Sequence, residues 1–307
     1  MNRYYLFLVF MLLFMHSLFG QDTIMNLWPK SVPNQIDIGE KEVDTLENIR
    51  WVRNVQRPSI EVYLPSVPNN TRKAILLFPG GGYQGLAYNW EGVDFAKAFN
   101  AQGIAGIVVK YRLPNSKSIV KNRHEVPLQD AQRAIRLVRS KAKEWNIDPE
   151  KIGIMGFSAG GHLASSLGVH YNDKVYDKQD EADELGARPN FMALIYPVIT
   201  MDDTFTHQGS REALLGNQKS DALKRRFSNE LHVNADTPPT FLLHATDDEA
   251  VVVENSLRFY SSLKNHKVQA TMHIYPSGGH GFALGLNHTL LNGWLNRFFD
   301  WLAFIDP

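Results

Sequence analysis

The chain has 307 residues, of which 44% are hydrophobic and 21% are charged, and its 32 basic residues balance its 32 acidic residues. This composition predicts a globular protein with a large core, and no basic stripe of the kind that binds nucleic acid is present. The chain has no cysteine, which excludes disulfide bonds and a lipid anchor on cysteine.

Residues 1–20 form a separate segment. A single arginine, Arg3, precedes an apolar run from Tyr4 to Phe14, and Ser17 and Gly20 follow. The run is short for a membrane span, and the whole pattern predicts a secretory signal peptide cleaved after Gly20, with a retained membrane anchor as the alternative. We therefore expect a secreted or periplasmic protein with no membrane contact after cleavage. Residues 21–307 are expected to form a single domain.

Strands and helices take turns along most of the remaining chain. Residues 21–57 are polar and weakly patterned, and we expect them to wrap the surface of the domain. Strands are predicted at residues 59–64, 74–78, 104–111, 152–155, 191–197, 241–245 and 271–275. The alternation predicts an α/β fold with a mostly parallel sheet covered by helices on both faces.

Two helices are predicted from their apolar periodicity. The first repeats apolar residues every three or four positions over residues 128–145, and the second does so over residues 291–305. On the other face of the first helix we expect a solvated row of charges, which comprises Arg133, Arg136, Arg139 and Lys143.

A glycine-rich loop, Pro79-Gly80-Gly81-Gly82-Tyr83, follows the strand predicted at residues 74–78. Three glycines in a row let the backbone approach a substrate closely with its N–H groups pointing inward. A phosphate-binding loop is the alternative, but the GxxxxGK[ST] pattern is missing.

A strand, a turn and a helix follow one another around Ser158, in the sequence Gly156-Phe157-Ser158-Ala159-Gly160. This arrangement is the nucleophile elbow typical of the α/β-hydrolase fold, in which a tight turn exposes the serine at a helix N-terminus. The elbow gives the glycine-rich loop a role, because this fold forms its oxyanion hole from that loop and from the residue after the nucleophile. We assign Gly81, Gly82 and Ala159 to the hole, and which of the two glycines donates is left open.

An acid and then a histidine should follow the serine in this fold. His280 lies between two glycines on a loop after the strand at residues 271–275, where no packing role accounts for it. Two aspartates follow the strand at residues 241–245, and the spacing from Ala245 and to Val251 favours Asp248 over Asp247. The expected catalytic residues are therefore Ser158, Asp248 and His280, with Asp247 as the alternative acid.

Residues 200–237 are irregular, and in this fold such a segment forms a cap over the site. A cap of this small size suits polymer or oligomer substrates. Tyr83, Tyr88 and Trp90, near the glycine-rich loop, are candidates for stacking on sugar rings, with packing of the loop as the alternative. Tyr111, at the end of the strand predicted at residues 104–111, is a candidate for lining the cleft, and we expect Tyr83, Trp90 and Tyr111 to bind substrate.

Four segments, residues 79–86, 128–165, 237–257 and 273–282, resemble secreted bacterial α/β-hydrolases of the carbohydrate-esterase type, often labelled acetylxylan esterase or esterase/lipase. The resemblance covers roughly residues 55–305. Two positions depart from it: Pro79 stands where hormone-sensitive-lipase-like relatives have histidine, and Val252 replaces a proline often seen there.

The resemblance implies a serine ester hydrolase that deacetylates a plant polysaccharide such as xylan, through an acyl-enzyme and without a metal or other cofactor. A feruloyl or other short-chain esterase is the nearest alternative. A serine peptidase of the same fold and a non-catalytic binding protein are more distant alternatives. The expected partner is an acylated carbohydrate, and the sequence predicts nothing about the oligomeric state.

Overall fold

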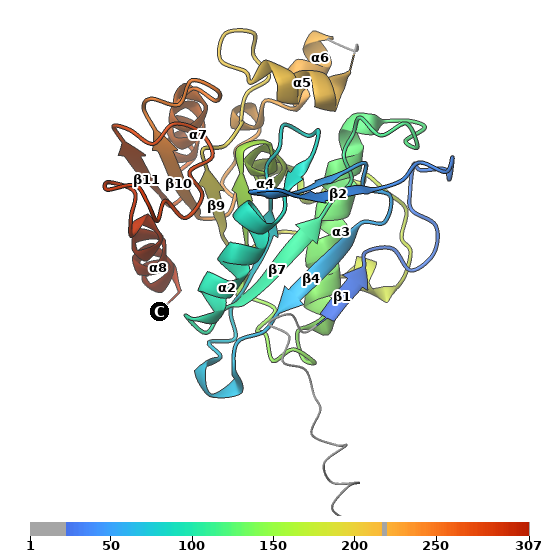
Figure 1. Ribbon diagram of the computed structural model, residues 1–307, viewed down its shortest axis with the longest axis horizontal. Helices are drawn as coiled ribbons and strands as arrows, with labels where there is room; N and C mark the ends of the chain where they lie inside the picture. The colour runs from blue at the N-terminus through green and yellow to red at the C-terminus, as the bar shows by residue number, and fades with distance from the viewer. Residues whose placement is uncertain (1–22, 217–219, 307) are drawn as a thin grey trace, which may run out of the picture.

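The buried apolar runs of the sequence become the strands of one large sheet. The computed structural model describes residues 23–216 and 220–306. Its eight-stranded sheet has the order β1-β4-β7-β5-β8-β9-β10-β11 (Figure 1). These strands are β1 Thr23–Asn26, β4 Ser59–Tyr63, β5 Ala74–Phe78, β7 Ala105–Lys110, β8 Ile152–Phe157, β9 Met192–Ile195, β10 Thr240–Ala245 and β11 Ala270–Tyr275.

The strands from β7 to β11 in this order are parallel to one another, whereas β1 and β4 pair antiparallel at one edge. The carboxyl ends of parallel strands meet at one edge of a sheet, and open α/β sheets place their ligands outside that edge. The loops after β5, β8, β9, β10 and β11 therefore come together, although they are far apart in the sequence.

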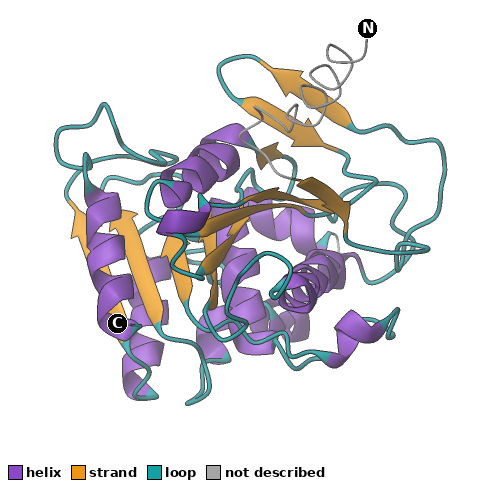
Figure 2. Cartoon of the chain, turned by 90° about the horizontal axis from the view of Figure 1, so that it is seen from below, coloured by secondary structure: helices purple, strands orange, loops and turns teal. Residues whose placement is uncertain are grey.

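Helices cover both faces of this sheet, as Figures 1 and 2 show, which confirms the expected α/β architecture. They are α2 Asp94–Asn100, α3 Val126–Lys141, α4 Ser158–His170, α7 Glu254–Asn265 and α8 Trp294–Ile305. On one face, α2 contacts α8 through the rings of Phe99 and Phe298, whose centroids lie 5.9 Å apart. On the other face, α3 packs against α4.

Residues 21–57, expected only to wrap the surface of the domain, also form strands. Besides β1, this segment forms β2 Val43–Leu46 and β3 Arg50–Arg53, which build a small second sheet with β6 Leu86–Ala87. All four residues of β2 are exposed, so no alternation of apolar and polar residues marks this strand in the sequence. Short 3₁₀ turns lie at Val67–Asn69, Arg123–Glu125 and Glu181–Glu184.

The row of charges expected on α3 is also corrected at one position. Arg133 is only 1% exposed, and its guanidinium donates to both carboxylate oxygens of Asp180 at 2.6 Å and to the carbonyl of Leu27 at 2.7 Å. Segments distant in the sequence cover this part of the helix, which periodicity within α3 cannot reveal.

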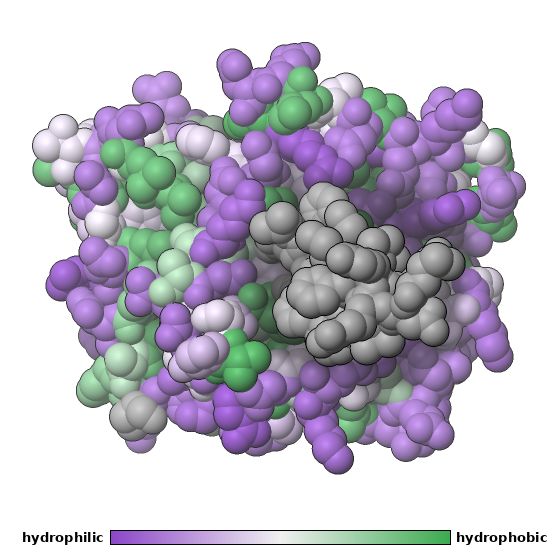
Figure 3. Space-filling model, turned by 60° about the horizontal axis from the view of Figure 1, so that its bottom comes forward, coloured by the Kyte–Doolittle hydropathy of each residue, from purple (hydrophilic) through white to green (hydrophobic). Residues whose placement is uncertain are grey.

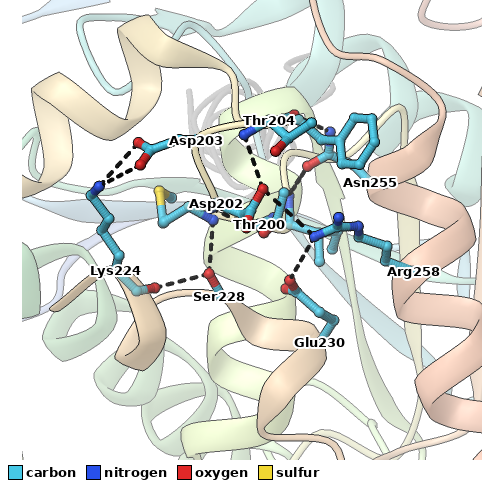
Figure 4. Close-up of polar contacts among 12 residues, drawn as sticks. Thr200, Asp202, Asp203, Thr204, Lys224, Ser228, Glu230, Asn255 and Arg258 are labelled. Atoms are coloured by element: carbon cyan, nitrogen blue, oxygen red, sulfur yellow. Dashed lines mark hydrogen bonds and ion pairs between the residues drawn. The ribbon is translucent and has the colours of Figure 1, made fainter. Parts of the chain in front are cut away.

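The segment expected as a cap contains α5 Gln208–Leu215, α6 Asp221–Arg226 and the turn η5 Asn229–Leu231. Its base is tied to the domain by the polar contacts in Figure 4. The Asn255 side chain on α7 accepts from the backbone N–H groups of Ile199 and Thr200 at 2.9 and 3.1 Å. Asp203 pairs with Lys224 at 2.8 Å, which joins the start of the segment to α6.

Hydrophilic residues predominate on the face seen in Figure 3, with apolar residues in smaller groups between them. Within residues 23–216 and 220–306, no helix combines the length and apolar character that crossing a bilayer requires. The expected signal peptide, residues 1–20, lies outside the described residues.

Candidate active site

The turn from β8 to α4 places Ser158 in a left-handed backbone conformation, with φ of 52°. A non-glycine residue in this region is strained, and such strain is common at functional sites. The turn also needs its two glycines. A Cβ on Gly160 would lie 2.0 Å from the carbonyl oxygen of Phe78, and one on Gly156 would lie 2.2 Å from that of Gly160. Strand and helix thus approach so closely that side chains are excluded at both positions.

Ser158, His280 and Asp248 lie in one continuous line of hydrogen bonds. His280 Nε2 is 2.9 Å from Ser158 Oγ, and His280 Nδ1 is 2.7 Å from Asp248 Oδ2. The carboxylate only accepts, so Nδ1 donates to it and Nε2 is left to accept from the serine hydroxyl. The structure therefore brings together the three residues that the sequence singles out.

The two adjacent aspartates have different partners. Asp248 is 3% exposed and also accepts from the backbone N–H groups of Ala250 and Val251 at 3.0 and 2.9 Å. Burial by itself would raise the pKa of Asp248, but hydrogen bonds from His244 and His280 outweigh it and hold that pKa well below its usual range.

Asp247 is exposed and holds the backbone of the histidine loop. Its two oxygens accept from the N–H groups of Gly278 and Gly279 at 3.2 and 2.8 Å. Asp247 thus contacts the loop that carries His280, whereas Asp248 contacts the imidazole itself.

In the glycine-rich loop, the N–H groups of Gly81, Gly82 and Tyr83 have no hydrogen-bond partner among the described residues, whereas the N–H of Gly80 donates to Glu91 Oε2 at 2.7 Å. Gly81 and Gly82 have positive φ, 134° and 63°, in agreement with the need for glycine. Ala159 lies in the first turn of α4, where backbone N–H groups have no partner within the helix.

The three aromatic candidates for substrate contact, Tyr83, Trp90 and Tyr111, differ in exposure. Tyr83 and Tyr111 are 1% and 0% exposed, and their hydroxyls bond to His162 Nδ1 at 2.8 Å and to the Pro79 carbonyl at 2.6 Å. Their expected role in substrate contact is therefore corrected, because both rings support the glycine-rich loop from inside. Trp90 is 37% exposed, and its indole N–H donates to the Gly281 carbonyl at 2.9 Å.

Three residues near this site had no assigned role in the sequence. Glu91 and Tyr196 are buried beside the loops, and Tyr196 stacks edge-on to the His280 ring with centroids 5.1 Å apart. His207, which precedes α5 in the cap, lies over Gly82, with its Cε1 4.0 Å from where a Cβ of that glycine would stand. No local pattern marks any of the three, because each reaches the site from a different loop.

His244 and His162 are buried and contact residues of the site, Asp248 and Tyr83 respectively. His244 at the end of β10 lies 3.3 Å from Asp248 Oδ2 and bonds to the carbonyl of Val251 at 2.8 Å. His162 on α4 joins Tyr83 to the cap, since its Nε2 donates to the Phe227 carbonyl at 2.8 Å. In the part of the chain that the structure describes, no group of three or more His, Cys, Asp or Glu residues could hold a metal ion.

Acidification is expected to destabilise the fold through His162. Burial lowers the pKa of His162 to about 4 from 6.5. Between pH 6.5 and pH 4 this histidine is protonated in the unfolded chain but neutral in the folded chain. The free energy of unfolding therefore decreases as the pH falls from 6.5 to 4. The complete decrease is about 3 kcal/mol. Urea unfolding at pH 7 and pH 4.5 should show a smaller drop for His162→Gln than for the wild type, and equal drops would contradict this account.

The sequence model of the BD-FAE family matches residues 60–263. The chain belongs to the BD-FAE family. BD-FAE is a family of α/β-hydrolases, and both the sheet order and the elbow at Ser158 in this structure are consistent with that fold.

Known relatives of this BD-FAE chain include carbohydrate-active enzymes. It is 39% identical over 227 residues to an acetylxylan esterase of Xylanibacter ruminicola, an alignment that covers 73% of this chain and 43% of the relative. It is 36% identical over 237 residues to an endo-1,4-beta-xylanase B of Butyrivibrio fibrisolvens, covering 77% and 36% respectively. The chain thus spans less than half the length of these curated relatives.

Among solved structures, the BD-FAE chain is similar to an acetyl ester-xyloside bifunctional hydrolase from Caldicellulosiruptor lactoaceticus. The TM-score is 0.80 at 35% sequence identity, and the match covers 94% of this chain and 98% of that one. The two chains therefore share the fold over nearly their whole lengths.

Proposed function

We propose that this protein is a serine carboxylic-ester hydrolase that removes acetyl groups from a plant polysaccharide such as xylan. The observation that carries this proposal is the hydrogen-bonded line from Ser158 Oγ through His280 to Asp248. The names of the relatives, acetylxylan esterase and acetyl ester-xyloside hydrolase, support the substrate class.

In the proposed reaction, Ser158 Oγ attacks the ester carbonyl while His280 Nε2 takes its proton. The negative oxygen of the tetrahedral intermediate accepts from the N–H groups of Gly81, Gly82 and Ala159. When the intermediate collapses, the bond to the sugar oxygen breaks and His280 returns the proton to that oxygen, which leaves as a sugar hydroxyl. An acetyl ester on Ser158 remains. Water, activated by the same imidazole, then releases acetate and restores the serine. Asp248 keeps Nδ1–H oriented and stabilises the imidazolium.

The leaving sugar has a natural position beside Trp90. Because His280 protonates the leaving oxygen, the alcohol must depart on the side of the histidine loop. A cavity of about 520 Å³ lies beside the histidine loop, lined by Trp90, by Asp94 and Lys97 of α2, and by residues 282–288. Its lining is mostly apolar, with a few polar side chains among which are Asp94, Lys97 and Asn287. This combination suits a sugar ring, which stacks through its apolar face and uses its hydroxyls for hydrogen bonds.

Trp90→Ala is expected to raise KM for acetylated xylo-oligosaccharides about 10-fold, since an aromatic contact of ~1.4 kcal/mol corresponds to that factor. Trp90→Phe keeps a ring and is expected to retain most of the affinity, although it loses the hydrogen bond to Gly281. Steady-state kinetics of both variants provide the test. An equal rise in KM for the two would assign the effect to the lost hydrogen bond, and an unchanged KM in Trp90→Ala would remove the indole from the sugar site.

Acid release from three esters tests the function. The protein is incubated with acetylated xylo-oligosaccharides, p-nitrophenyl acetate and methyl ferulate. Acetate from the oligosaccharide supports the proposal, and faster release of ferulate would instead favour the alternative of a feruloyl esterase. Release from p-nitrophenyl acetate alone would sink the xylan assignment, and no release would favour a peptidase or binding role.

We propose further that residues 1–20 are removed as a signal peptide and that the chain from Gln21 is one exported domain. The intact mass of the protein recovered from the periplasm or medium tests this, and a mass that includes residues 1–20 would contradict it.

A further inference from the structure

Glu91 is a buried carboxylate that the proposed reaction does not use. It lies on a single π-helical turn, Asn89–Val93, and is 4% exposed. A glutamate is almost never fully buried unless its carboxylate has partners, because removing its charge from water is costly. Single π-helical turns are themselves frequent at functional sites.

Both oxygens of Glu91 accept hydrogen bonds from loops around the site. Oε2 accepts from the N–H of Gly80 at 2.7 Å, and Oε1 accepts from the hydroxyl of Tyr196 at 2.8 Å. An ionised carboxylate fits this arrangement, because neither oxygen donates to a neighbour. Burial raises the pKa of Glu91, and the hydrogen bonds from Tyr196 and Gly80 oppose that rise.

Tyr196 extends the connection to the histidine loop. Its hydroxyl oxygen also accepts from the N–H of Ala283 at 3.1 Å, and its ring lies against the rings of His280 and Phe282. The backbone of Tyr196 is fixed by its N–H bond to the Leu243 carbonyl at 2.7 Å, and its φ is 37°. A strained, buried tyrosine of this kind persists only where its surroundings hold it.

Glu91 and Tyr196 therefore connect the glycine-rich loop of the proposed oxyanion hole with the loop that carries His280. One end of the pair holds Gly80, next to the donors of the oxyanion hole. The other end holds Ala283, three residues after His280. Trp90, the neighbour of Glu91, adds a second tie from the same turn through its bond to Gly281.

The charge of Glu91 also acts on the base. Glu91 and His280 interact electrostatically. Among the described residues, the other titratable groups around the pair are Tyr111 beside Glu91, Tyr196 between Glu91 and His280, Asp248 and His207 beside His280, and His244 beside Asp248. A negative charge in a buried, low-dielectric site favours the imidazolium that forms during the reaction.

We propose that Glu91 is a positioning residue of this active site: with Tyr196 it fixes the oxyanion loop relative to His280, and its negative charge stabilises the protonated imidazole. This inference rests on the proposed ester hydrolysis.

Glu91→Gln tests the inference, because it keeps the shape of the side chain and removes the charge. We expect kcat for p-nitrophenyl acetate to fall about 10- to 100-fold with little change in KM, since a small misplacement of the reacting groups has this effect. We also expect the acidic limb of the kcat/KM profile to move to lower pH by on the order of one unit. A merely structural role would lower the amount of folded protein without moving this limb.

Tyr196→Phe is the matched variant. It removes the hydroxyl that joins Glu91 to Ala283 but keeps the carboxylate of Glu91, so kcat should fall while the acidic limb does not move to lower pH. Unchanged kcat and an unmoved limb in Glu91→Gln, or identical shifts in both variants, would overturn the inference.

A readout without turnover separates this inference from the proposed function. The ring signals of His280 are titrated by NMR in the wild type and in Glu91→Gln, and assigned by comparison with His280→Gln. The midpoint should lie at lower pH in Glu91→Gln even if no ester is hydrolysed. An identical midpoint in a protein that does hydrolyse esters would overturn the charge effect alone and leave the proposed function standing.

Discussion

Replacing Ser158 by alanine is expected to lower kcat for ester hydrolysis by about 10⁶-fold, the loss seen when the nucleophile of a serine hydrolase is removed. The reason is that no other hydroxyl lies within hydrogen-bond distance of His280 Nε2 among the described residues. What remains is the contribution of the oxyanion donors and of substrate binding, which act without the nucleophile.

The variant is expected to fold, because alanine lacks only the hydroxyl oxygen of serine and brings no additional atom into the elbow. Circular dichroism and urea unfolding provide this control. A folded Ser158→Ala protein that retained more than about 1% of the wild-type kcat would contradict a role for Ser158 as nucleophile.

Exchanging Asp248 for asparagine is expected to lower kcat by about 10⁴-fold, because an amide at this position favours the wrong tautomer of the imidazole. The substitution also removes a charge that His244, His280 and two backbone N–H groups all contact.

Asp247→Asn is the matched control at the adjacent residue. Its amide oxygen can still accept from Gly279, so the histidine loop is loosened but the imidazole keeps its partner. We expect a loss of about 10-fold or less. Steady-state kinetics with p-nitrophenyl acetate decide between the two, and a larger loss in Asp247→Asn would make that residue the acid.

The sequence predicts those parts of the site whose signals are local. The elbow at Ser158 and the glycines beside His280 are each contained in a few residues, because tight turns and close backbone approach need particular residue types at particular places. The parallel strands are equally visible, since burial on both faces requires continuous apolar runs.

Contacts between distant segments could not be predicted in this way. Glu91 and Tyr196 meet only because β5 and β9 both flank β8 in the sheet. By its spacing in the sequence Arg133 belongs to the polar face of its helix, yet segments around Leu27 and Asp180 cover it. Tyr83 follows the glycine-rich loop directly in the sequence, as a substrate contact would. Its backbone has a positive φ of 58°, however, and its ring is buried.

The central claim is that an acyl group passes through Ser158. The most direct measurement is the intact mass of the protein after rapid acid quenching with p-nitrophenyl acetate, followed by mapping of the modified peptide. The account predicts a transient gain of one acetyl group on the peptide that contains Ser158, and no such gain in Ser158→Ala. Turnover of the ester without an acetylated Ser158, or the same acetylation in Ser158→Ala, would contradict it.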